Sequence, residues 1–171
     1  MPSRQILAYL DDAQAEYRRL EHTLAYTALE VAESAHIRGL ELAKVVILDI
    51  DAELAMMVIP ASFRIDLDQI NQSIRAFSIE LADASQFRHR LKGCEAGAIP
   101  PFGNLYDMEV YIAEPLTHAS TITFCAGSHT ELIQMPYQQF SELVKPIVVR
   151  YGSSPIGATP ARVREHTGHN F

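Results

Sequence analysis

Apolar positions at helical spacing, together with capping residues, predict five helices along the chain. Near the start, apolar residues at positions 6, 7, 10 and 13 follow Ser3, a residue type typical of helix N-caps. Further on, a Thr-x-x-Glu capping box opens the second helix, Asp66 precedes the third and Pro136 lies in the first turn of the fifth. The expected helices cover residues 3–15, 27–35, 66–74, 84–91 and 137–144.

Runs of apolar and β-branched residues predict the strands. Lys44–Ile50 and Leu54–Ile59 are nearly continuous in apolar character and flank an acidic turn, which predicts an antiparallel hairpin buried on both faces. Further strands are expected at 77–81, 109–113, 121–124 and 130–135. Because helices and strands alternate irregularly, the sequence predicts an α+β fold with a mixed, largely antiparallel sheet and flanking helices.

The distribution of apolar residues also predicts the domain organisation. A single compact domain is expected over residues 1–151, since a chain of 171 residues with 48% hydrophobic content supports one well-buried core. Residues 152–171 are rich in Gly, Ser, Pro and Thr and lack apolar periodicity. They therefore predict a flexible C-terminal tail.

Composition and charge limit the location and the partners of the protein. The longest apolar runs fall far short of the roughly 20 residues of a membrane-spanning helix. The N-terminus becomes acidic at Asp11, so we expect no secretory signal and a cytoplasmic location. The formal net charge of −7 excludes a protein that coats nucleic acid with its whole surface, so any contact with nucleic acid must be local.

Three features carry candidate chemistry, each with a purely structural alternative. The loop from Gly97 to Tyr106 places two prolines between glycines, so it is either a rigid loop whose backbone approaches a bound group or a tight turn. Lys44 opens an apolar strand, so it is either a desolvated donor for a negative charge or a lysine that reaches water. The turn from Gly127 to His129 sets backbone N–H groups beside an imidazole, as an oxyanion site requires, unless His129 is an exposed turn residue.

Other kinds of site lack their sequence patterns. Ser128 is not part of a G-x-S-x-G elbow, which argues against a serine hydrolase, and the absence of G-x-G-x-x-G argues against a dinucleotide-binding fold. His166 and His169 form half of a metal motif without a further ligand, while Cys94 and Cys125 are far apart in the sequence. We therefore expect no metal site, no disulfide framework and no cofactor.

Four blocks of sequence occur in an order that is more specific than any one of them. They are ALEVAESAHIRGLELAKVVIL, MMVIPASFRIDL, GAIPPFGNLY and AGSHTELIQMPYQQFSELVKP. In this order they resemble the YbaK/prolyl-tRNA synthetase-associated editing domain family of free-standing aminoacyl-tRNA deacylases, over residues 17–149. The resemblance implies a compact domain with a partly barrel-like central sheet, which agrees with the strands expected above.

The resemblance also implies a set of site residues. Lys44 matches the family's central lysine, which follows a helix and opens a strand, and Gly103 and His129 join it as expected catalytic residues. The expected substrate-binding residues come from the T-x-x-E-V-A block, the G-x-x-P-F-G loop and the AGSH turn. They are Tyr26, Thr27, Gly97, Pro100, Pro101, Phe102, Gly127 and Ser128. The AGSH turn departs from the best-known subgroups, so the amino acid of the substrate stays open.

The chemistry that the resemblance implies is hydrolysis of the ester joining an amino acid to the terminal ribose of mischarged tRNA. In this interpretation Lys44 holds a phosphate, the ribose or the oxyanion, backbone N–H groups hold the carbonyl, and a ribose hydroxyl helps to activate water. The expected partner is the acceptor end of tRNA, with an aminoacyl-tRNA synthetase as a further candidate and no contact with membrane or DNA. The basic patch expected to touch the tRNA consists of Lys44, Arg64, Arg88, Arg90 and Lys92.

Two other functions stay open on the sequence alone. The pocket would also suit a non-catalytic module that binds aminoacyl-tRNA or a small ligand in association with a synthetase. It would equally suit a hydrolase of another small ester or amide, since a fold does not determine its reaction. Lys44 favours the enzyme over the binding module.

Overall fold

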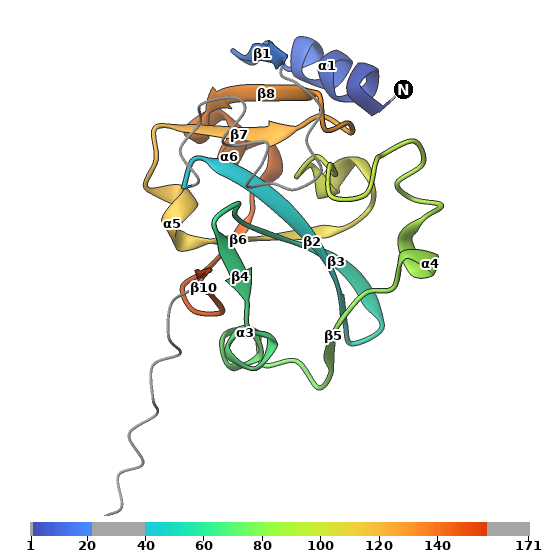
Figure 1. Cartoon of the computed structure of the whole chain (residues 1–171), viewed down its shortest axis with the longest axis vertical. Helices are drawn as coiled ribbons and strands as arrows, with labels where there is room; N and C mark the ends of the chain where they lie inside the picture. Colours follow the sequence, from blue (N-terminus) through green and yellow to red (C-terminus); the bar gives the residue numbers. More distant parts are fainter. Residues whose placement is uncertain (1, 22–39, 157–171) are drawn as a thin grey trace, which may run out of the picture.

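One mixed sheet of eight strands forms the centre of the computed structural model, which describes residues 2–21 and 40–156. Seven strands follow one another across this sheet, and the eighth, β5 (Ile79–Leu81), pairs with the second half of β2. The seven are, in spatial order, β1 (Arg18–Glu21), β8 (Glu131–Pro136), β7 (Thr121–Cys125), β2 (Leu42–Ile50), β3 (Glu53–Pro60), β6 (Glu109–Ala113) and β9 (Ile147–Val149). The hairpin β2–β3 crosses the middle of the molecule in Figure 1.

The pairing of the strands confirms the predicted fold class. β2 and β3 form the expected antiparallel hairpin, and the pair Ile50↔Glu53 leaves only Asp51 and Ala52 in the turn. β1–β8, β7–β8 and β2–β5 are also antiparallel, whereas β2–β7, β3–β6 and β6–β9 are parallel. Within the described residues the sheet does not close into a barrel, because β1 and β9 each pair with one neighbour.

Helices cover the two faces of the sheet and divide its apolar residues into separate cores. α1 (Pro2–Asp12) and α6 (Tyr137–Val144) bury Ile6, Leu10 and Phe140 in the main core. α3 (Leu67–Ile74) buries Ile70 in a second core on the other face. Figure 1 shows α1 beside β8 and β1 at one end of the molecule and α3 below β4 (Phe63–Ile65) at the other.

Several predicted elements are confirmed at or near their expected bounds. The strand expected at 109–113 is β6, and the helix expected after Asp66 is α3, where the Gln69 N–H donates to Asp66 Oδ1 at 3.2 Å. The helix expected at 137–144 is α6, although Pro136 is its N-cap residue and lies just outside the first turn. The helix expected at 27–35 lies outside the described residues.

Three expected helix or strand bounds are wrong. The helix expected at 84–91 is only α4 (Ala84–Phe87), which buries none of its residues, so packing does not extend it further. The first helix ends at Asp12 because Gln14 has a φ of 53°, which no right-handed helix accommodates. The strand expected from Phe77 begins at Ile79, and Phe77 itself is fully exposed.

The first residues of the expected tail contact the domain. β10 (Ser153–Pro155) pairs with β4 (Phe63–Ile65), and Gly152 lies so close to Ile70 that a Cβ on it would stand 2.2 Å from Ile70 Cγ1. A flexible tail is therefore the wrong description for residues 153–155. The rest of the expected tail lies beyond the described residues, and the domain boundary at residue 151 stays a prediction.

The remaining short elements connect the strands. α5 (Glu114–Thr117) joins β6 to β7, and a 3₁₀ turn, η1 (Gly103–Leu105), precedes β6. No helix in the described part of the chain is long and apolar enough to cross a membrane.

Candidate functional site

Lys44 lies on the sheet face that is turned away from the main core. Side chains alternate along a strand, and its neighbours Ala43 and Val45 contact the main core. Lys44 is directly opposite Ile59 on β3, so it shares a face with that buried residue and with Leu42 on its own strand. Lys44 is therefore a cation whose neighbours on the same sheet face, Leu42 and Ile59, are apolar.

The Lys44 ammonium group is partly buried, and no anionic side chain of the described residues pairs with it. Within the described residues it forms no hydrogen bond or ion pair, and burial alone lowers the pKa of Lys44. A buried charge without a counter-ion costs stability unless a ligand supplies the missing negative charge. Perturbed and unpaired groups of this kind are typical of functional sites.

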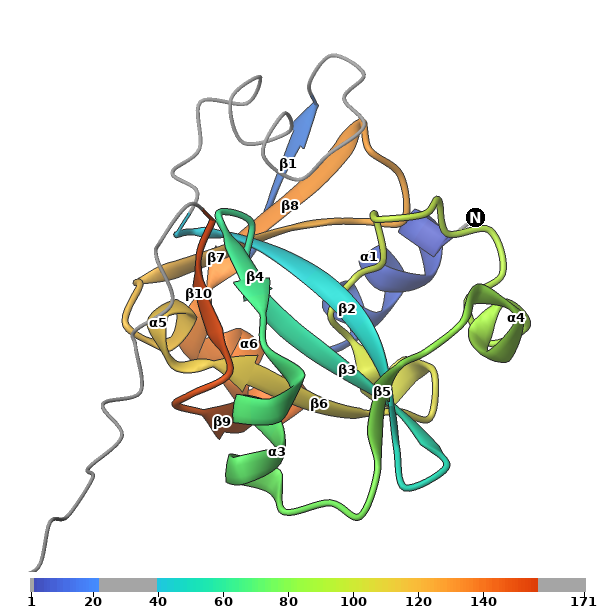
Figure 2. The same ribbon diagram turned by 60° about the horizontal axis from the view of Figure 1, so that its bottom comes forward.

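The sheet splits at Lys44. β2 and β7 lie side by side as parallel strands (Figure 2), but their pairing consists of Leu42↔Thr123 and Ala43↔Phe124 only. The next residues along the two strands are Lys44 and Cys125, where the pairing stops. Ala98 packs with Leu42 and Cys125 in a small apolar cluster, which brings the Gly97 loop to this split.

The Gly97 loop and the Gly127 turn are joined by backbone hydrogen bonds. The Gly127 N–H donates to Ala98 O at 2.9 Å, and the Glu95 N–H donates to Gly127 O at 2.8 Å. Gly97 and Gly127 have φ of 78° and 98°, values that favour glycine strongly. The structure therefore brings two of the three features of candidate chemistry into direct contact, and the packing of Ala98 with Leu42 places them next to the strand that carries the third, Lys44.

Glu95 and His129 fasten the same two segments through side chains. The His129 N–H donates to Glu95 Oε2 at 3.0 Å, and His129 Nε2 lies 2.6 Å from Ala96 O. A carbonyl oxygen only accepts, so Nε2 carries a proton, while Nδ1 is buried without a partner among the described residues. We call the pair Glu95 and His129, with the Ala96 carbonyl, the latch.

The latch fixes the position of the His129 side chain, and the assignment of His129 as a catalytic residue stays a prediction. Its Nε2–H is occupied by Ala96 O, and His129 is only 8% exposed, so the imidazole is in no position to act as an exposed general base. The hydrogen bonds instead hold the turn in place. Sequence analysis missed Glu95 because it lies 34 residues from His129 and no motif links them.

Two backbone N–H groups of the Gly97 loop and the Gly127 turn are candidate donors. Those of Gly97 and Ser128 donate to no acceptor in the described part of the chain. The N–H of Gly127, in contrast, is already used by Ala98 O. The hydroxyl of Ser128 lies 3.1 Å from Thr130 Oγ1.

The second half of the Pro/Gly loop belongs to the main core and not to the Lys44 face. Phe102 is fully buried and packs edge-on against Tyr9, Phe124 and Phe140, with ring centroids 5.3 to 5.9 Å apart. A Cβ on Gly103 would stand 2.4 Å from Met108 O, so this glycine permits close packing of the backbone.

This placement separates the predicted loop residues into two groups. Pro100 and Pro101 are buried next to Phe102 and Gly103, whereas Gly97 is exposed at the His129 turn. The structure thus brings Gly97, Gly127, Ser128 and His129 together next to β2, the strand that carries Lys44. Tyr26 and Thr27 lie outside the described residues.

The basic patch expected to touch tRNA is dispersed. Lys44 is on β2, Arg64 on β4, and the Arg90 guanidinium donates from Nη1 to Asp107 O at 3.3 Å. Arg88 and Lys92 line one cavity together, whereas Arg90 lines the cavity at the tip of the β2–β3 hairpin. No group of three or more His, Cys, Asp or Glu residues in the described part of the chain is placed to hold a metal ion.

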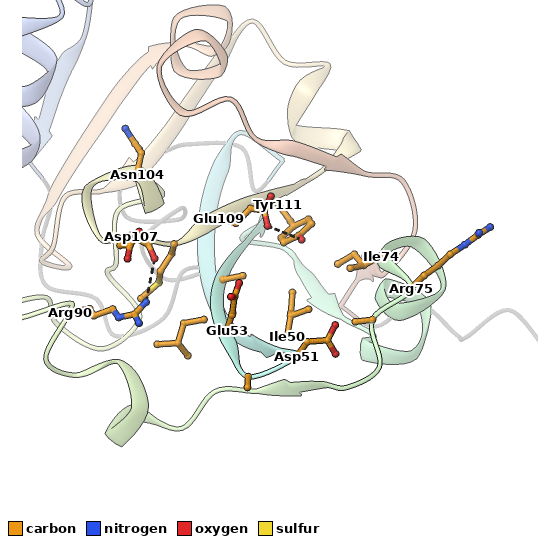
Figure 3. A pocket seen from close by; sticks show the side chains of 15 residues that line it. Ile50, Asp51, Glu53, Ile74, Arg75, Arg90, Asn104, Asp107, Glu109 and Tyr111 are labelled. Atoms are coloured by element: carbon orange, nitrogen blue, oxygen red, sulfur yellow. Dashed lines mark hydrogen bonds between the residues drawn. The ribbon is translucent and has the colours of Figure 1, made fainter.

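A large cavity of about 890 Å³ lies at the tip of the β2–β3 hairpin (Figure 3). Four carboxylates line it, those of Asp51, Glu53, Asp107 and Glu109, and Tyr111 OH donates to Glu109 Oε2 at 3.2 Å. Figure 3 shows that Arg75 extends away from these side chains. The surplus of negative charge makes this cavity a poor place for a phosphate, and none of the predicted site residues lines it.

Comparison with known proteins identifies the family. Residues 22–143 match the aminoacyl-tRNA editing domain, and this stretch is more than half of the chain. The chain belongs to the aminoacyl-tRNA editing domain family. The family predicted from the four sequence blocks is thereby confirmed, and the matched residues include Lys44, the latch and both free N–H groups.

Solved structures share the fold of this editing domain at low identity. A candidate trans-editing enzyme for prolyl-tRNA synthetase is 17% identical, with a TM-score of 0.76 over 87% of this chain and 95% of that one. A hypothetical protein has the same TM-score at 18% identity, over 88% of this chain and 99% of that one. A candidate signal transduction protein from Marinobacter aquaeolei matches at 13% identity and a TM-score of 0.64, over 86% of this chain and 30% of its own. No curated protein matches the chain significantly.

Proposed function

We propose that this editing domain is a trans-acting deacylase that hydrolyses the ester bond of mischarged tRNA in the cytoplasm and so maintains translation fidelity. The observation that carries the proposal is Lys44, a partly buried cation without a counter-ion among the described residues, placed where two parallel strands separate. A ligand with a phosphate or a developing oxyanion supplies the charge that Lys44 lacks. Membership of the editing domain family supports the choice of aminoacyl-tRNA as that ligand.

The reaction requires stabilisation of negative charge on the ester carbonyl oxygen. Water adds to the carbonyl carbon, the bond from that carbon to the ribose oxygen breaks, and the ribose oxygen takes up a proton, which releases the free amino acid. The N–H groups of Gly97 and Ser128 and the ammonium of Lys44 are the available donors. Removing one such donor costs on the order of 3 kcal/mol of transition-state stabilisation.

The proton acceptor for the attacking water is assigned to the substrate in this proposal. The His129 Nε2–H is committed to Ala96 O, and Nδ1 is buried. The free hydroxyl of the terminal ribose is then the nearest group that can orient and deprotonate water. His129 acts as a positioning residue, because it holds the turn that carries the Ser128 N–H.

A deacylation screen tests the proposal. Purified protein is mixed with a panel of correctly and wrongly charged tRNAs, and release of the amino acid is followed with Lys44→Ala beside the wild type. We expect selective release of one amino acid, and a loss of about 10²- to 10³-fold in rate for Lys44→Ala. Lys145→Asn is the matched control, since it removes an exposed cation from a left-handed position that asparagine tolerates.

The outcome separates the enzyme from the alternatives. Tight binding of aminoacyl-tRNA without release from any panel member would support a non-catalytic binding module. Equal hydrolysis of simple amino-acid esters and of aminoacyl-tRNA would support a general small-ester hydrolase. Unchanged turnover in Lys44→Ala would remove Lys44 from the mechanism.

A further inference from the structure

We propose that a second cavity, on the outer side of the loop at residues 94–99, binds a nucleotide adjacent to the esterified end of the tRNA. This inference rests on the proposed function and adds to it a subsite for the nucleic acid. The cavity has a volume of about 410 Å³, within the range of small-molecule sites.

The walls of this cavity combine apolar surface with two cations. Phe87, Leu91 and Ile99 supply the apolar part, and Arg88 and Lys92 supply the charge. Both cations are exposed, and neither side chain has a hydrogen bond or ion pair within the described residues. Phe87 is partly buried against the main core, so its position is set by packing.

This combination is the chemistry of single-stranded nucleic acid sites. Such sites join an aromatic side chain, on which a base stacks, to cations that contact the backbone phosphates. Among the described residues, Glu95 is the only carboxylate in the wall of the cavity, and its Oε2 accepts the His129 N–H. The cavity therefore has a surplus of positive charge in a protein whose net charge is −7, whereas the larger cavity of Figure 3 is rich in carboxylates.

One loop separates the cavity from the Lys44 face. Glu95 and Ala96 line the cavity on the outer side and hold His129 through the latch, while Ala98 packs on Leu42 and Cys125 at the split in the sheet. A nucleotide in the cavity would thus contact the same loop that positions the Gly97 and Ser128 N–H groups. The subsite should strengthen binding of substrates that carry tRNA and have no effect on a small ester.

The test measures the binding of an uncharged RNA minihelix that ends in CCA, as a function of salt concentration. The double variant Arg88→Gln/Lys92→Gln removes both cations, and Arg75→Gln is a control that removes an exposed cation at the other cavity. We expect the double variant to bind more weakly and to lower the slope of log K against log salt by about 1.4, since each phosphate contact to a single strand contributes about 0.7. Arg75→Gln should match the wild type.

A second variant separates stacking from charge. Phe87→Leu keeps the apolar packing and removes the aromatic face, and we expect its affinity to fall about fivefold or more, with an unchanged salt slope. Binding of the double variant equal to that of the wild type, or an equal loss in Arg75→Gln, would overturn the subsite.

Deacylation kinetics distinguish failure of the subsite from failure of the proposed function. If the double variant raises KM for aminoacyl-tRNA and leaves hydrolysis of an amino-acid methyl ester unchanged, both proposals stand. Unchanged KM with active wild-type enzyme would overturn the subsite alone. RNA binding that depends on Arg88 and Lys92, in a wild-type protein that deacylates nothing, would support the subsite and contradict the deacylase.

Discussion

Replacement of Phe102 by alanine should destabilise the protein strongly without touching the site directly. The ring is fully buried in the main core, on the sheet face opposite Lys44. The sequence-based assignment of Phe102 to the substrate pocket predicts the reverse outcome, a loss of substrate binding in a stable protein. This one side chain therefore tests the division of the Pro/Gly loop into a core half and a site half.

The structure sets the expected magnitude. Truncation of a buried Phe to Ala costs about 3–5 kcal/mol, which includes the cavity left behind. Phe102 also loses edge-on contacts with the rings of Tyr9, Phe124 and Phe140, each worth about 0.5–1.5 kcal/mol beyond the buried area. We expect a loss near the upper end, about 4–5 kcal/mol, which for a domain of this size lowers Tm by about 8–20 °C.

The assay is urea and thermal unfolding followed by far-UV circular dichroism, since the chain has no tryptophan. Phe77→Ala is the matched control, because Phe77 is fully exposed and its loss should change the free energy of unfolding by less than about 0.5 kcal/mol. Phe102→Leu should keep wild-type turnover per folded molecule. A Phe102→Ala protein with wild-type stability and no activity would refute the placement of Phe102 in the core.

Further predictions concern the hairpin turn, Lys44 and the buried thiol. Ala52 has a φ of 66° in the two-residue turn of the β2–β3 hairpin, so Ala52→Gly should raise the free energy of unfolding by about 0.5–1 kcal/mol; an unchanged or lower urea midpoint would count against it. Burial lowers the pKa of Lys44, so the unfolded chain binds this proton more tightly, and the stability of the wild type should rise as pH increases from the folded pKa toward the unfolded value. Lys44→Met should accordingly have a higher free energy of unfolding than the wild type at pH 7, and the difference between the two proteins should be smaller at pH 10. A difference that grows with pH would contradict the expected direction of the pKa shift. Burial raises the pKa of Cys125 to about 12, so this thiol should react with a disulfide reagent at pH 8 only after unfolding, and rapid reaction in the native protein would be the contrary result.

Six of the eight strands of the sheet could be predicted because their sequence signals are local, whereas the short edge strands β1 and β9 were missed. Continuous apolar runs at 44–50 and 54–59 mark two neighbouring strands that are largely buried, and the acidic residues between them mark the turn. The helix at 84–91 could not be delimited in the same way. Its apolar residues Phe87 and Leu91 are at helical spacing, but α4 ends at Phe87, and the chain beyond it lines a cavity.

The site was only partly predictable, because tertiary packing decides which of the loop residues belong to it. Lys44 is visible as a single cation in an apolar strand, and the glycines at 97 and 127 are visible as turn residues. The face of the sheet on which each loop residue lies depends on tertiary packing, so Phe102 and Gly103 were assigned to the pocket although they belong to the core. The latch between Glu95 and His129 joins residues 34 positions apart and leaves no local signal.

The most direct test of the account is the single-turnover rate of deacylation of the best mischarged tRNA by wild-type protein, Lys44→Met and Lys145→Asn, each shown to be folded at the assay temperature. The account predicts that Lys44→Met is at least as stable as the wild type and slower by about 10²- to 10³-fold, while Lys145→Asn is unchanged. A folded Lys44→Met protein with the wild-type rate would contradict the central claim that the unpaired cation at the split of the sheet carries the reaction.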